Sequence, residues 1–545
     1  MIVVNTKGMA ALIFAFLIVI ISCKSVVPQP QASQPKNVLF IIADDFRPEV
    51  YAGYNQKHMI TPNLDKLVKQ SLVFQRAYCQ HAVCIPSRNS FMTGRRPDTT
   101  KVWIGIGNPD FRVTGPDWVS LPEHFKNSGY TTLGGGKTYH PGHPPNYDEP
   151  KSWSQDQSYF PLNATKCPKP PGEDEDDSSN STLKDDVSGI DTWCPLSEKK
   201  YPDSYHFEYK LATHTIDTLK YVNKKGGPWF VAAGFYKPHV PWVMPQRFWD
   251  MYEDVNIPDV LHRKRPINSP DIAYHNQGFF LDTNGTKYLP MPNPFPLEIQ
   301  QDARRAYMAA VSWVDSQIGR VLDALDSMGL SNNTLVVLFG DHGFQLGEHD
   351  SWHKQTNWEL AARVPMIIRA PWKPASQGKN SYALVESVDL YRTISELVGA
   401  PKPGDDIEGT SFATLFDNPD LTAEEAASVM NTTATAYSQY PRCVNNATIQ
   451  WDNNGCSNEH DVPTYMGYSI RTPEWRYTSW MPWDRKAMRA MWDGKPYAVE
   501  LYDHSGDPEA ENDHNQSDVE NVASQHEDIV EQLQAQLKTF FDVKK

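Results

Sequence analysis

Continuous apolar runs recur along the first two thirds of the chain, separated by longer segments in which apolar positions repeat with a helical period. Each run has the pattern of a strand buried on both faces of a sheet. The runs are residues 37–43, 229–235, 334–340 and 364–368, and a further short strand is predicted at 130–134. Helices are predicted at 61–71, 302–328 and 388–398. This alternation predicts a parallel or mixed sheet covered by helices on both faces.

The pattern changes from about residue 436, where short aromatic segments with strand-like composition replace the long alternation. These segments are residues 437–442, 466–471, 475–480 and 497–502. Residues 529–541 have the pattern of a terminal helix. The last part of the chain is therefore predicted to form a small antiparallel sheet packed by one or two helices.

Residues suited to metal binding or acid–base chemistry directly follow four of the predicted strands. These residues are Asp44 and Asp45, Lys137 and His140, His239, and Asp341 and His342. In open α/β sheets, ligands bind beyond the carboxyl ends of the strands. One histidine after a strand is usually structural, whereas four such strand ends indicate a shared site. The alternative for Asp44 and Asp45 is a surface turn, since buried carboxylates need a cation or hydrogen-bond donors.

The three carboxylates Asp44, Asp45 and Asp341 offer hard oxygen ligands. They favour Ca²⁺ or Mg²⁺ over zinc, because the sequence shows no cluster of cysteine and histidine ligands. Ca²⁺ tolerates irregular coordination better than Mg²⁺ does, so it is the preferred interpretation.

A short motif at 84–88 combines Cys84, Pro86, Ser87 and Arg88 in the pattern C-x-P-S-R. On its own, this pattern also fits a core thiol followed by a proline in the first turn of a helix. Arg88 lies about one helical turn from Cys84, so both side chains can reach one site.

Together with further motifs, this stretch resembles the formylglycine-dependent sulfatases, and within them the enzymes specific for 2-sulfated iduronate. The matching stretches are Asp44-Asp45, AVCIPSR (82–88), TGRRPDTT (93–100), GKTYHPG (136–142), KPHVP (237–241), DHGFQLGEH (341–349), YSQYPR (437–442) and MGYSIRT (466–472). The resemblance implies an alkaline-phosphatase-like α/β/α sandwich with a large mixed sheet, and a smaller C-terminal domain with an antiparallel sheet. The predicted division is a signal peptide at 1–25, a catalytic domain at 34–440 and a C-terminal subdomain at 441–545.

The resemblance also implies site residues. The metal ligands for one Ca²⁺ would be Asp44, Asp45, Cys84, Asp341 and His342. Cys84 would be converted to formylglycine (3-oxoalanine) by a formylglycine-generating enzyme. His342 departs from the wider family, which often has asparagine there. The catalytic residues besides Cys84 would be Arg88, Lys137, His140, His239 and Lys354, with His140 as the base that drives sulfate release.

Composition limits the possible partners and the possible location of the protein. The chain has 545 residues and a net charge of −15, which argues against a nucleic-acid partner. Residues 9–21 form an apolar run after Lys7, too short to span a membrane and typical of a signal peptide; no other membrane segment is predicted. We expect a secretory protein, lysosomal or secreted. The alternative is a bacterial periplasmic protein or lipoprotein, in which Cys23 would be lipidated.

The other cysteines and the long insertions suit an exported protein. Cys167 with Cys194, and Cys443 with Cys456, are closely spaced pairs that we expect to form disulfides, leaving Cys79 as an odd thiol. Long irregular segments are predicted at 141–200, which holds an acidic run at 173–177, and at 241–296. Seven glycosylation sequons support secretion mildly. They are Asn163, Asn180, Asn284, Asn332, Asn431, Asn446 and Asn515.

The activity implied by the resemblance is exo-hydrolysis of the 2-O-sulfate of terminal L-iduronate in heparan or dermatan sulfate. Alternatives are a sulfatase for another sulfated sugar or choline sulfate, a formylglycine-dependent phosphonate or phosphodiester hydrolase, and a non-catalytic glycan-binding protein. The net charge of −15 does not exclude an anionic substrate, because such a substrate needs only a local cationic pocket. In an acidic compartment, protonation of the 17 histidines would also offset much of this negative charge. Lys101 or Arg471 would meet the substrate carboxylate, with Arg471 preferred.

Overall fold

The computed structural model describes residue 1 and most of the chain from residue 36 onward. The described residues are 1, 36–103, 110–168, 193–260, 262–274, 280–281, 287–288, 296–444, 455–456, 462–507 and 518–542. The predicted signal peptide at 1–25, apart from residue 1, and the acidic run at 173–177 lie outside them.

A seven-stranded mixed sheet carries the larger part of the described chain. In spatial order its strands are β13 (Lys379–Glu386), β2 (Leu72–Tyr78), β12 (Arg363–Arg369), β9 (Thr334–Gly340), β1 (Asn37–Ala43), β5 (Trp229–Phe235) and β3 (Thr131–Gly136). β12 runs antiparallel to both of its neighbours, and the other pairs are parallel. The sheet is therefore mixed, as predicted, and the fold is an alkaline-phosphatase-like α/β/α sandwich.

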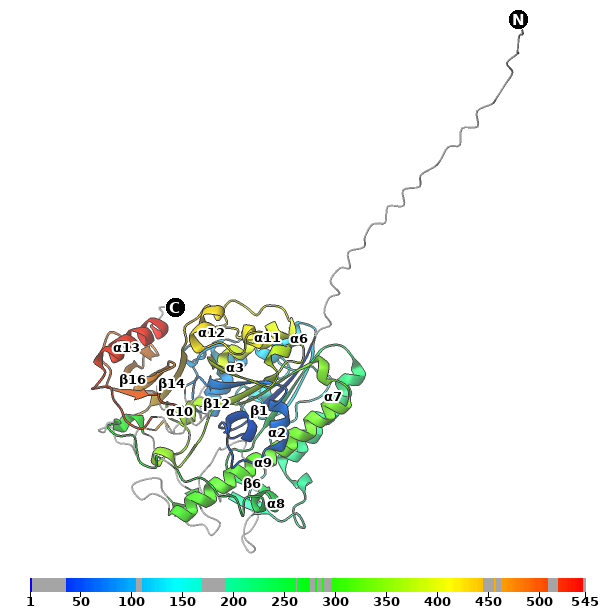
Figure 1. Cartoon of the computed structure of the whole chain (residues 1–545), viewed down its shortest axis with the longest axis horizontal. Helices are drawn as coiled ribbons and strands as arrows, with labels where there is room; N and C mark the ends of the chain where they lie inside the picture. The colour runs from blue at the N-terminus through cyan, green and yellow to red at the C-terminus, as the bar shows by residue number, and fades with distance from the viewer. Residues whose placement is uncertain are drawn as a thin grey trace. The chain divides into compact units, whose positions relative to one another are not determined.

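Alternate residues of β1 enter two different cores, because successive side chains of a strand point to opposite faces. Leu39 and Ile41 belong to one core, and Val38 and Phe40 to the other. The helices α2 (Pro62–Val68), α7 (Phe207–Lys225) and α9 (Leu297–Ser327) contribute to the first core. The second core takes side chains from α3 (Cys84–Thr93), α6 (Leu121–Asn127) and α11 (Leu390–Val398). Figure 1 shows these two sets of helices on the two faces.

All five predicted strands of the main sheet are present, and two further strands were not predicted. β2 contains Gln75 and Arg76, which are buried although polar, so its sequence lacks a continuous apolar run. β13 begins with exposed polar residues. The helix predicted at 302–328 is α9; it begins earlier, at Leu297, and ends at Ser327.

The C-terminal region forms the predicted antiparallel sheet. Its strands are β14 (Ala436–Arg442), β15 (Tyr465–Arg471), β16 (Trp475–Asp484), β17 (Arg489–Ala490) and β18 (Ala498–Asp503), the last of which pairs with β16. α13 (Glu527–Phe541) packs on this sheet, with Leu533 and Leu537 in a core beside Tyr468 and Tyr477. β14 begins at Ala436, so this sheet starts slightly before the domain boundary predicted at 440/441. The domain boundary itself stays a prediction.

Short elements connect these layers. They are α1 (Tyr51–Tyr54), α4 (Pro97–Thr100), α5 (Phe111–Thr114), β4 (Trp193–Leu196), β6 (Trp242–Pro245), α8 (Gln246–Asp250), β7 (Phe280–Leu281), β8 (Lys287–Tyr288), β10 (Gln345–Leu346), β11 (Trp352–His353), α10 (Glu359–Ala362) and α12 (Ala423–Met430). β4 and β6 pair in parallel, so the insertions predicted to be irregular contain ordered pieces.

The predicted disulfide pairs and the odd thiol are confirmed. Disulfides join Cys167 to Cys194 and Cys443 to Cys456, and Cys79 is a buried free thiol. None of the helices in the described part of the chain is long and apolar enough to cross a membrane.

Candidate active site

The site lies at the edge of the main sheet where the parallel strands end. Asp44 and Asp45 follow β1, Lys137 follows β3, and Asp341 follows β9. Cys84 begins α3, six residues after Tyr78, the last residue of β2. β12 runs in the opposite direction, so its beginning lies at this same edge and is reached through α10.

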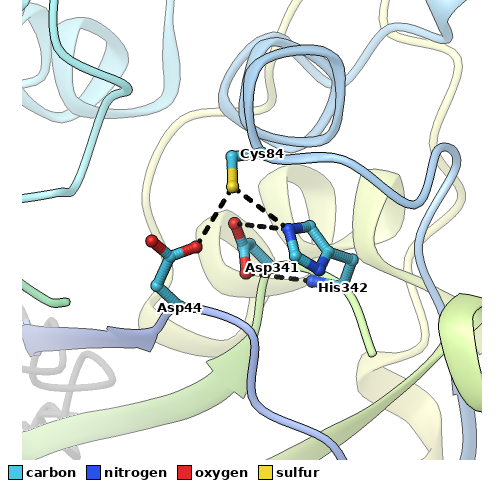
Figure 2. A group of neighbouring side chains, drawn as sticks. All are labelled: Asp44, Cys84, Asp341 and His342. Carbon is cyan, nitrogen blue, oxygen red and sulfur yellow. Dashed lines mark hydrogen bonds and ion pairs between the residues drawn. The ribbon is translucent and has the colours of Figure 1, made fainter. Parts of the chain in front are cut away.

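Cys84 stands at the centre of the cluster. Its Sγ lies 3.3 Å from Oδ1 of Asp44 and 3.2 Å from Nε2 of His342. Ligand atoms of Asp44, Cys84, Asp341 and His342 all lie within 4.8 Å of one another, and those of Asp45, Cys84 and His239 do so as well. Figure 2 shows the first set converging on one point. The structure thus brings the five predicted metal ligands together around residue 84.

Three histidines of the site each place Nδ1 against the carbonyl oxygen of the next residue, which leaves Nε2 available to a ligand. Nδ1 of His342 lies 3.0 Å from the carbonyl oxygen of Gly343, and Nδ1 of His239 lies 2.6 Å from that of Val240. His140 makes the same contact with Pro141 at 3.0 Å. Because a carbonyl can only accept, each Nδ1 carries the proton and Nε2 keeps its lone pair. His342 is therefore prepared as a metal ligand through Nε2.

Three buried cations face the carboxylates. Nζ of Lys137 lies 2.6 Å from Oδ2 of Asp44 and 3.6 Å from Sγ of Cys84. Nζ of Lys354 pairs with Asp45 and also lies 3.6 Å from that sulfur. Arg88 lies 3.0 Å from Oδ2 of Asp341 and 3.3 Å from Oδ1 of Asp44. Three carboxylates thus offset three cations, so a bound divalent ion would make the cluster positive and suited to an anion.

The protonation states follow from burial and these charges. Burial alone would raise the pKa of Asp44, but Lys137, His239 and Arg88 outweigh it and hold the pKa well below its ordinary value. Burial raises the pKa of Asp45 despite Lys354. Burial, followed by the Asp44 charge, raises the pKa of the Cys84 thiol well above its ordinary value. An unmodified Cys84 is therefore a thiol here, a weak nucleophile.

The donor set fits a hard divalent cation. The side chain of Asp45 is fully buried, and its Oδ2 accepts no hydrogen bond from the described residues. A buried carboxylate oxygen without a donor is costly, and a cation would satisfy it. Three carboxylates around the site are typical of Ca²⁺ or Mg²⁺ rather than zinc.

Two glycines let the loops of this edge approach closely. Gly136 has φ +70°, and a Cβ there would lie 2.1 Å from the carbonyl oxygen of Gly234. A Cβ on Gly234 would lie 2.1 Å from the carbonyl carbon of Lys137. Side chains at either position would thus displace Lys137 from Asp44. Sequence reasoning missed both glycines, although their position at the ends of two predicted strands was a usable signal.

Lys354 sits in a segment with unusual backbone. Its neighbours His353 and Gln355 have φ of 73° and 76°, in the left-handed region that non-glycine residues rarely adopt. Glu348, near the start of the segment, lies 3.1 Å from Arg47 and 3.2 Å from Arg304, all three being buried. Sequence reasoning missed this anchor, since its members come from three distant parts of the chain.

The preferred candidate for the substrate carboxylate is wrong. Arg471 is 1% exposed and its Nε lies 3.3 Å from Oε2 of Glu359. Glu359 also pairs with Arg476 and accepts a hydrogen bond of 2.9 Å from the Tyr78 hydroxyl. Arg471 thus joins the C-terminal sheet to the catalytic sheet instead of facing a ligand. Lys101, the other candidate, is half-buried and lines a cavity of about 440 Å³.

His140 lies three residues beyond Lys137 and is 5% exposed, at the same edge of the sheet. Its role as a base, like the catalytic roles of the other residues, stays a prediction. The observed arrangement can bind a metal ion and place cations around an anionic group next to residue 84.

The α/β/α sandwich and this cluster of carboxylates and cations are the arrangement expected of a hydrolase that acts on an anionic ester. The family model described as "Sulfatase" matches residues 36–400. The chain belongs to the sulfatase family and hydrolyses sulfate esters.

Two curated relatives match most of the chain. Iduronate 2-sulfatase of Homo sapiens is 33% identical over 510 residues, covering 87% of this chain and 90% of the relative. The Mus musculus iduronate 2-sulfatase is 32% identical over 532 residues, covering 90% and 92%. A sulfatase of Formosa agariphila is 31% identical over 386 residues, covering 68% and 70%.

Solved structures with lower identity share the fold. One, in complex with its substrate D-glucosamine-2-N,6-O-disulfate, has a TM-score of 0.66 at 19% identity and covers 94% of this chain and 99% of its own. A phosphonate monoester hydrolase from Silicibacter pomeroyi has a TM-score of 0.63 at 21% identity, covering 93% and 95%.

Proposed function

We propose that this sulfatase is an exo-acting enzyme that removes the 2-O-sulfate from terminal L-iduronate of heparan sulfate or dermatan sulfate. The observation that carries the proposal is the buried cluster of metal-type ligands and cations around Cys84, in a chain that is 33% identical to iduronate 2-sulfatase. The YSQYPR and MGYSIRT stretches, in β14 and β15, add support for this specificity.

The nucleophile in this proposal is formylglycine at position 84, made from Cys84 by a formylglycine-generating enzyme. As the hydrated aldehyde, residue 84 would supply two geminal hydroxyls, one to attack sulfur and one to release the sulfate once deprotonated. The raised pKa of the Cys84 thiol supports this proposal, because an unmodified thiol would be poorly ionised here. His140 would take the proton of the second hydroxyl.

The residues proposed to hold one Ca²⁺ are Asp44, Asp45, residue 84, Asp341 and His342. When bound, Ca²⁺ would act as a Lewis acid that neutralises a sulfate oxygen and orients the attacking hydroxyl.

The cations have separate tasks in this mechanism. Arg88, Lys137 and Lys354 would donate to sulfate oxygens and stabilise charge that develops in the transition state. The pKa of His239 is held well below its ordinary value by burial and by Lys137, so the free enzyme has a neutral ring. An anionic sulfate beside Nε2 favours the protonated ring, which could then donate to the leaving oxygen.

We further propose that the chain enters the secretory pathway through a signal peptide at 1–25 and acts in lysosomes or outside the cell. The bacterial alternative is a periplasmic protein or lipoprotein. The two disulfides support an oxidising compartment. The partners in this proposal are a sulfated glycosaminoglycan or oligosaccharide and the formylglycine-generating enzyme.

Paired kinetics test the substrate. The substrates are a fluorogenic 2-sulfated iduronide and its carboxyl-reduced analogue, with choline sulfate and an aryl phosphate as comparisons. An enzyme that reads the carboxylate should prefer the acid by at least about tenfold in kcat/KM, or about 1.4 kcal/mol. Equal efficiency on the acid and its analogue would assign the enzyme to another sulfated sugar. Faster turnover of the aryl phosphate would favour a phosphate-ester hydrolase instead.

A further inference from the structure

The turn that presents His239 is held by side chains. It connects β5 to β6 and contains Pro238 and Pro241, which have no backbone N–H to donate. Its carbonyl oxygens nevertheless need donors, because the turn is largely buried. The question is which groups of the described chain satisfy them.

Aromatic side chains of neighbouring residues supply two of these donors. Nε1 of Trp242 donates to the carbonyl of Pro238 at 2.6 Å, and the hydroxyl of Tyr236 donates to the carbonyl of Val240 at 2.7 Å. The rings of Tyr236 and His239 have centroids 4.7 Å apart. Aromatic residues on either side of the turn therefore fix its path.

The side chain of Lys237 supplies two further hydrogen bonds. Its Nζ donates to the carbonyl oxygen of His239 at 3.0 Å and to that of Pro241 at 2.6 Å, and the Pro241 carbonyl also accepts from the backbone N–H of Val243 at 2.9 Å. Lys237 is 0% exposed, and its ammonium lies 4.4 Å from the centroid of the Tyr236 ring. One cation thus ties together the carbonyl groups of the two residues that flank Val240, and the carbonyl of Val240 itself accepts the hydrogen bond from Nδ1 of His239.

Placing the full charge of the Lys237 ammonium in this interior is costly. A simpler explanation is that the charge only balances a buried carboxylate. Glu208 of α7 is a fully buried carboxylate and the leading favourable electrostatic influence on Lys237. Lys237 could therefore serve only to neutralise Glu208. That explanation does not account for the two carbonyl contacts, since neither of them involves the carboxylate.

We infer that Lys237 is a positioning residue that fixes the imidazole of His239 in the active site. The ammonium holds the carbonyls of His239 and Pro241, and this holds the Val240 carbonyl 2.6 Å from Nδ1 of His239. Nε2 is then directed toward Asp45 and Cys84. The inference rests on the proposed catalytic role of His239.

The first test separates positioning from charge balance. Lys237→Met removes the ammonium, and Lys237→Met with Glu208→Gln removes both charges and so guards against a folding failure. We expect the double variant to regain part of the melting temperature that Lys237→Met loses, because the charges balance again, while kcat on the 2-sulfated iduronide stays about 100-fold lower, since a misplacement of about 1 Å can cost that much. Recovery of at least half of the wild-type kcat would overturn the inference and leave charge balance as the role.

The second test is a double-mutant cycle with His239→Ala, read as kcat and as the inhibition constant of inorganic sulfate. If Lys237 acts through His239, adding the Lys237 and Glu208 changes to His239→Ala should lower kcat less than about threefold further. Additive losses would overturn the inference alone. Full activity of His239→Ala would overturn the proposed role of His239, and the inference with it.

Lys126 offers a matched control. Its Nζ donates to the carbonyls of Lys151 and Trp153, at 3.3 and 2.8 Å, in a loop outside the catalytic cluster. Lys126→Met removes a comparable lysine–carbonyl clamp and should leave kcat within about twofold of wild type. A loss equal to that of the Lys237 variant would mean that any such clamp matters to activity, which would overturn the specific role of Lys237.

Discussion

At the scale of single residues, the environment of Cys84 decides its chemistry. The sulfur is 3.6 Å from two lysine amines, which would favour a thiolate, yet burial and the Asp44 charge prevail and raise its pKa. Cys79, five residues earlier, is also buried, and burial likewise raises its pKa, but it lies outside the metal-type cluster. Two neighbouring thiols thus share a protonation state while only one has ligands around it.

The modification of Cys84 can be checked directly. We expect peptide mass spectrometry of active enzyme to find formylglycine at position 84 and an unmodified thiol at Cys79, which serves as an internal control. Cys84→Ala should abolish turnover while the melting temperature stays near that of wild type, because a methyl group fills most of the same space. Fully active protein with only a thiol at position 84 would contradict the mechanism.

Asp45 should matter chiefly through metal binding. Asp45→Asn keeps the shape but removes the charge beside Oδ2, which has no described donor. Loss of a ligand charge should lower Ca²⁺ affinity and kcat on the order of 100-fold, measured by metal analysis after dialysis and by kinetics. The control is Asp203→Asn, at an exposed pair with Arg247. Normal activity after exhaustive chelation, with no metal detected, would refute the site.

At the scale of elements, the segment from β10 to Gln355 depends on ion pairs outside itself. Gly347, His349, Asp350, His353 and Gln355 all have positive φ, a costly conformation for the four that are not glycine. The pairing of β10 with β11 and the contacts of Glu348 with Arg47 and Arg304 oppose this cost. These contacts place Lys354 next to residue 84.

Glu348→Gln should therefore weaken both stability and activity. It leaves buried Arg304 without its carboxylate partner and buried Arg47 with Glu49 alone, at a cost of about 3 kcal/mol in the free energy of unfolding. Burial would raise the pKa of Glu348, but Arg47 and Arg304 lower it to about 2. The contribution is thus complete above about pH 4.5 and is lost as the pH falls toward 2.

Chemical denaturation at several pH values measures this effect. The difference between wild type and Glu348→Gln should be equal at pH 7 and pH 5 and should shrink below pH 4.5. As a control, Glu198→Gln removes an exposed partner of Arg247 and should cost less than about 1 kcal/mol. Equal stability of wild type and Glu348→Gln at pH 7 would show that the segment does not depend on this carboxylate.

At the scale of the whole molecule, buried groups set the response to pH more than the net charge of −15 does. The expectation that all 17 histidines gain protons in an acidic compartment is wrong for the buried His81 and His206. Burial lowers the pKa of His81 to about 3 and that of His206 to about 4, so both stay neutral at pH 5. Mild acidity therefore offsets less of the negative charge than the sequence suggests.

Asp315 should make the protein more stable in mild acid. It lies on α9 and accepts from the backbone N–H groups of Asn63 and Leu64 at 3.3 and 2.7 Å. Burial raises its pKa from 3.8 to about 7. Between these values the folded state holds a proton that the unfolded state has lost, so stability falls as the pH rises from about 4 to about 7.

Asp315→Asn tests this contribution, because asparagine does not titrate. The substitution also disturbs the hydrogen bonds to α2, so the informative quantity is how the stability difference changes with pH. Between pH 4 and pH 7, the free energy of unfolding should fall less in the variant than in wild type. The two changes should differ by several kcal/mol at most. The deficit of the variant relative to wild type should therefore be largest near pH 4. A deficit that does not change with pH would refute the shifted titration.

The sequence alone determined the elements whose signals are local. Apolar runs revealed four strands of the main sheet, and a fifth was predicted at the short segment 130–134. Aromatic segments revealed the C-terminal sheet, and close cysteine spacing revealed both disulfides. The site residues that follow strands, among them Asp44 and Asp341, were also visible, because carboxyl ends of parallel strands share one edge. Cys84 and Lys354 were expected from the motifs of the resemblance instead. These features depend on a residue and its near neighbours in the chain, which is the information that a single sequence carries.

Only the tertiary structure decided what depends on distant partners. In the folded chain β12 runs antiparallel to its neighbours. Lys354 pairs with Asp45, 309 residues away in the sequence, and Arg471 pairs with Glu359, 112 residues away. The polar strand β2 is buried by its neighbours rather than by its own pattern. A charged side chain has no periodicity that reveals its partner, so the choice between a buried ion pair and a ligand contact is made only when the chain folds.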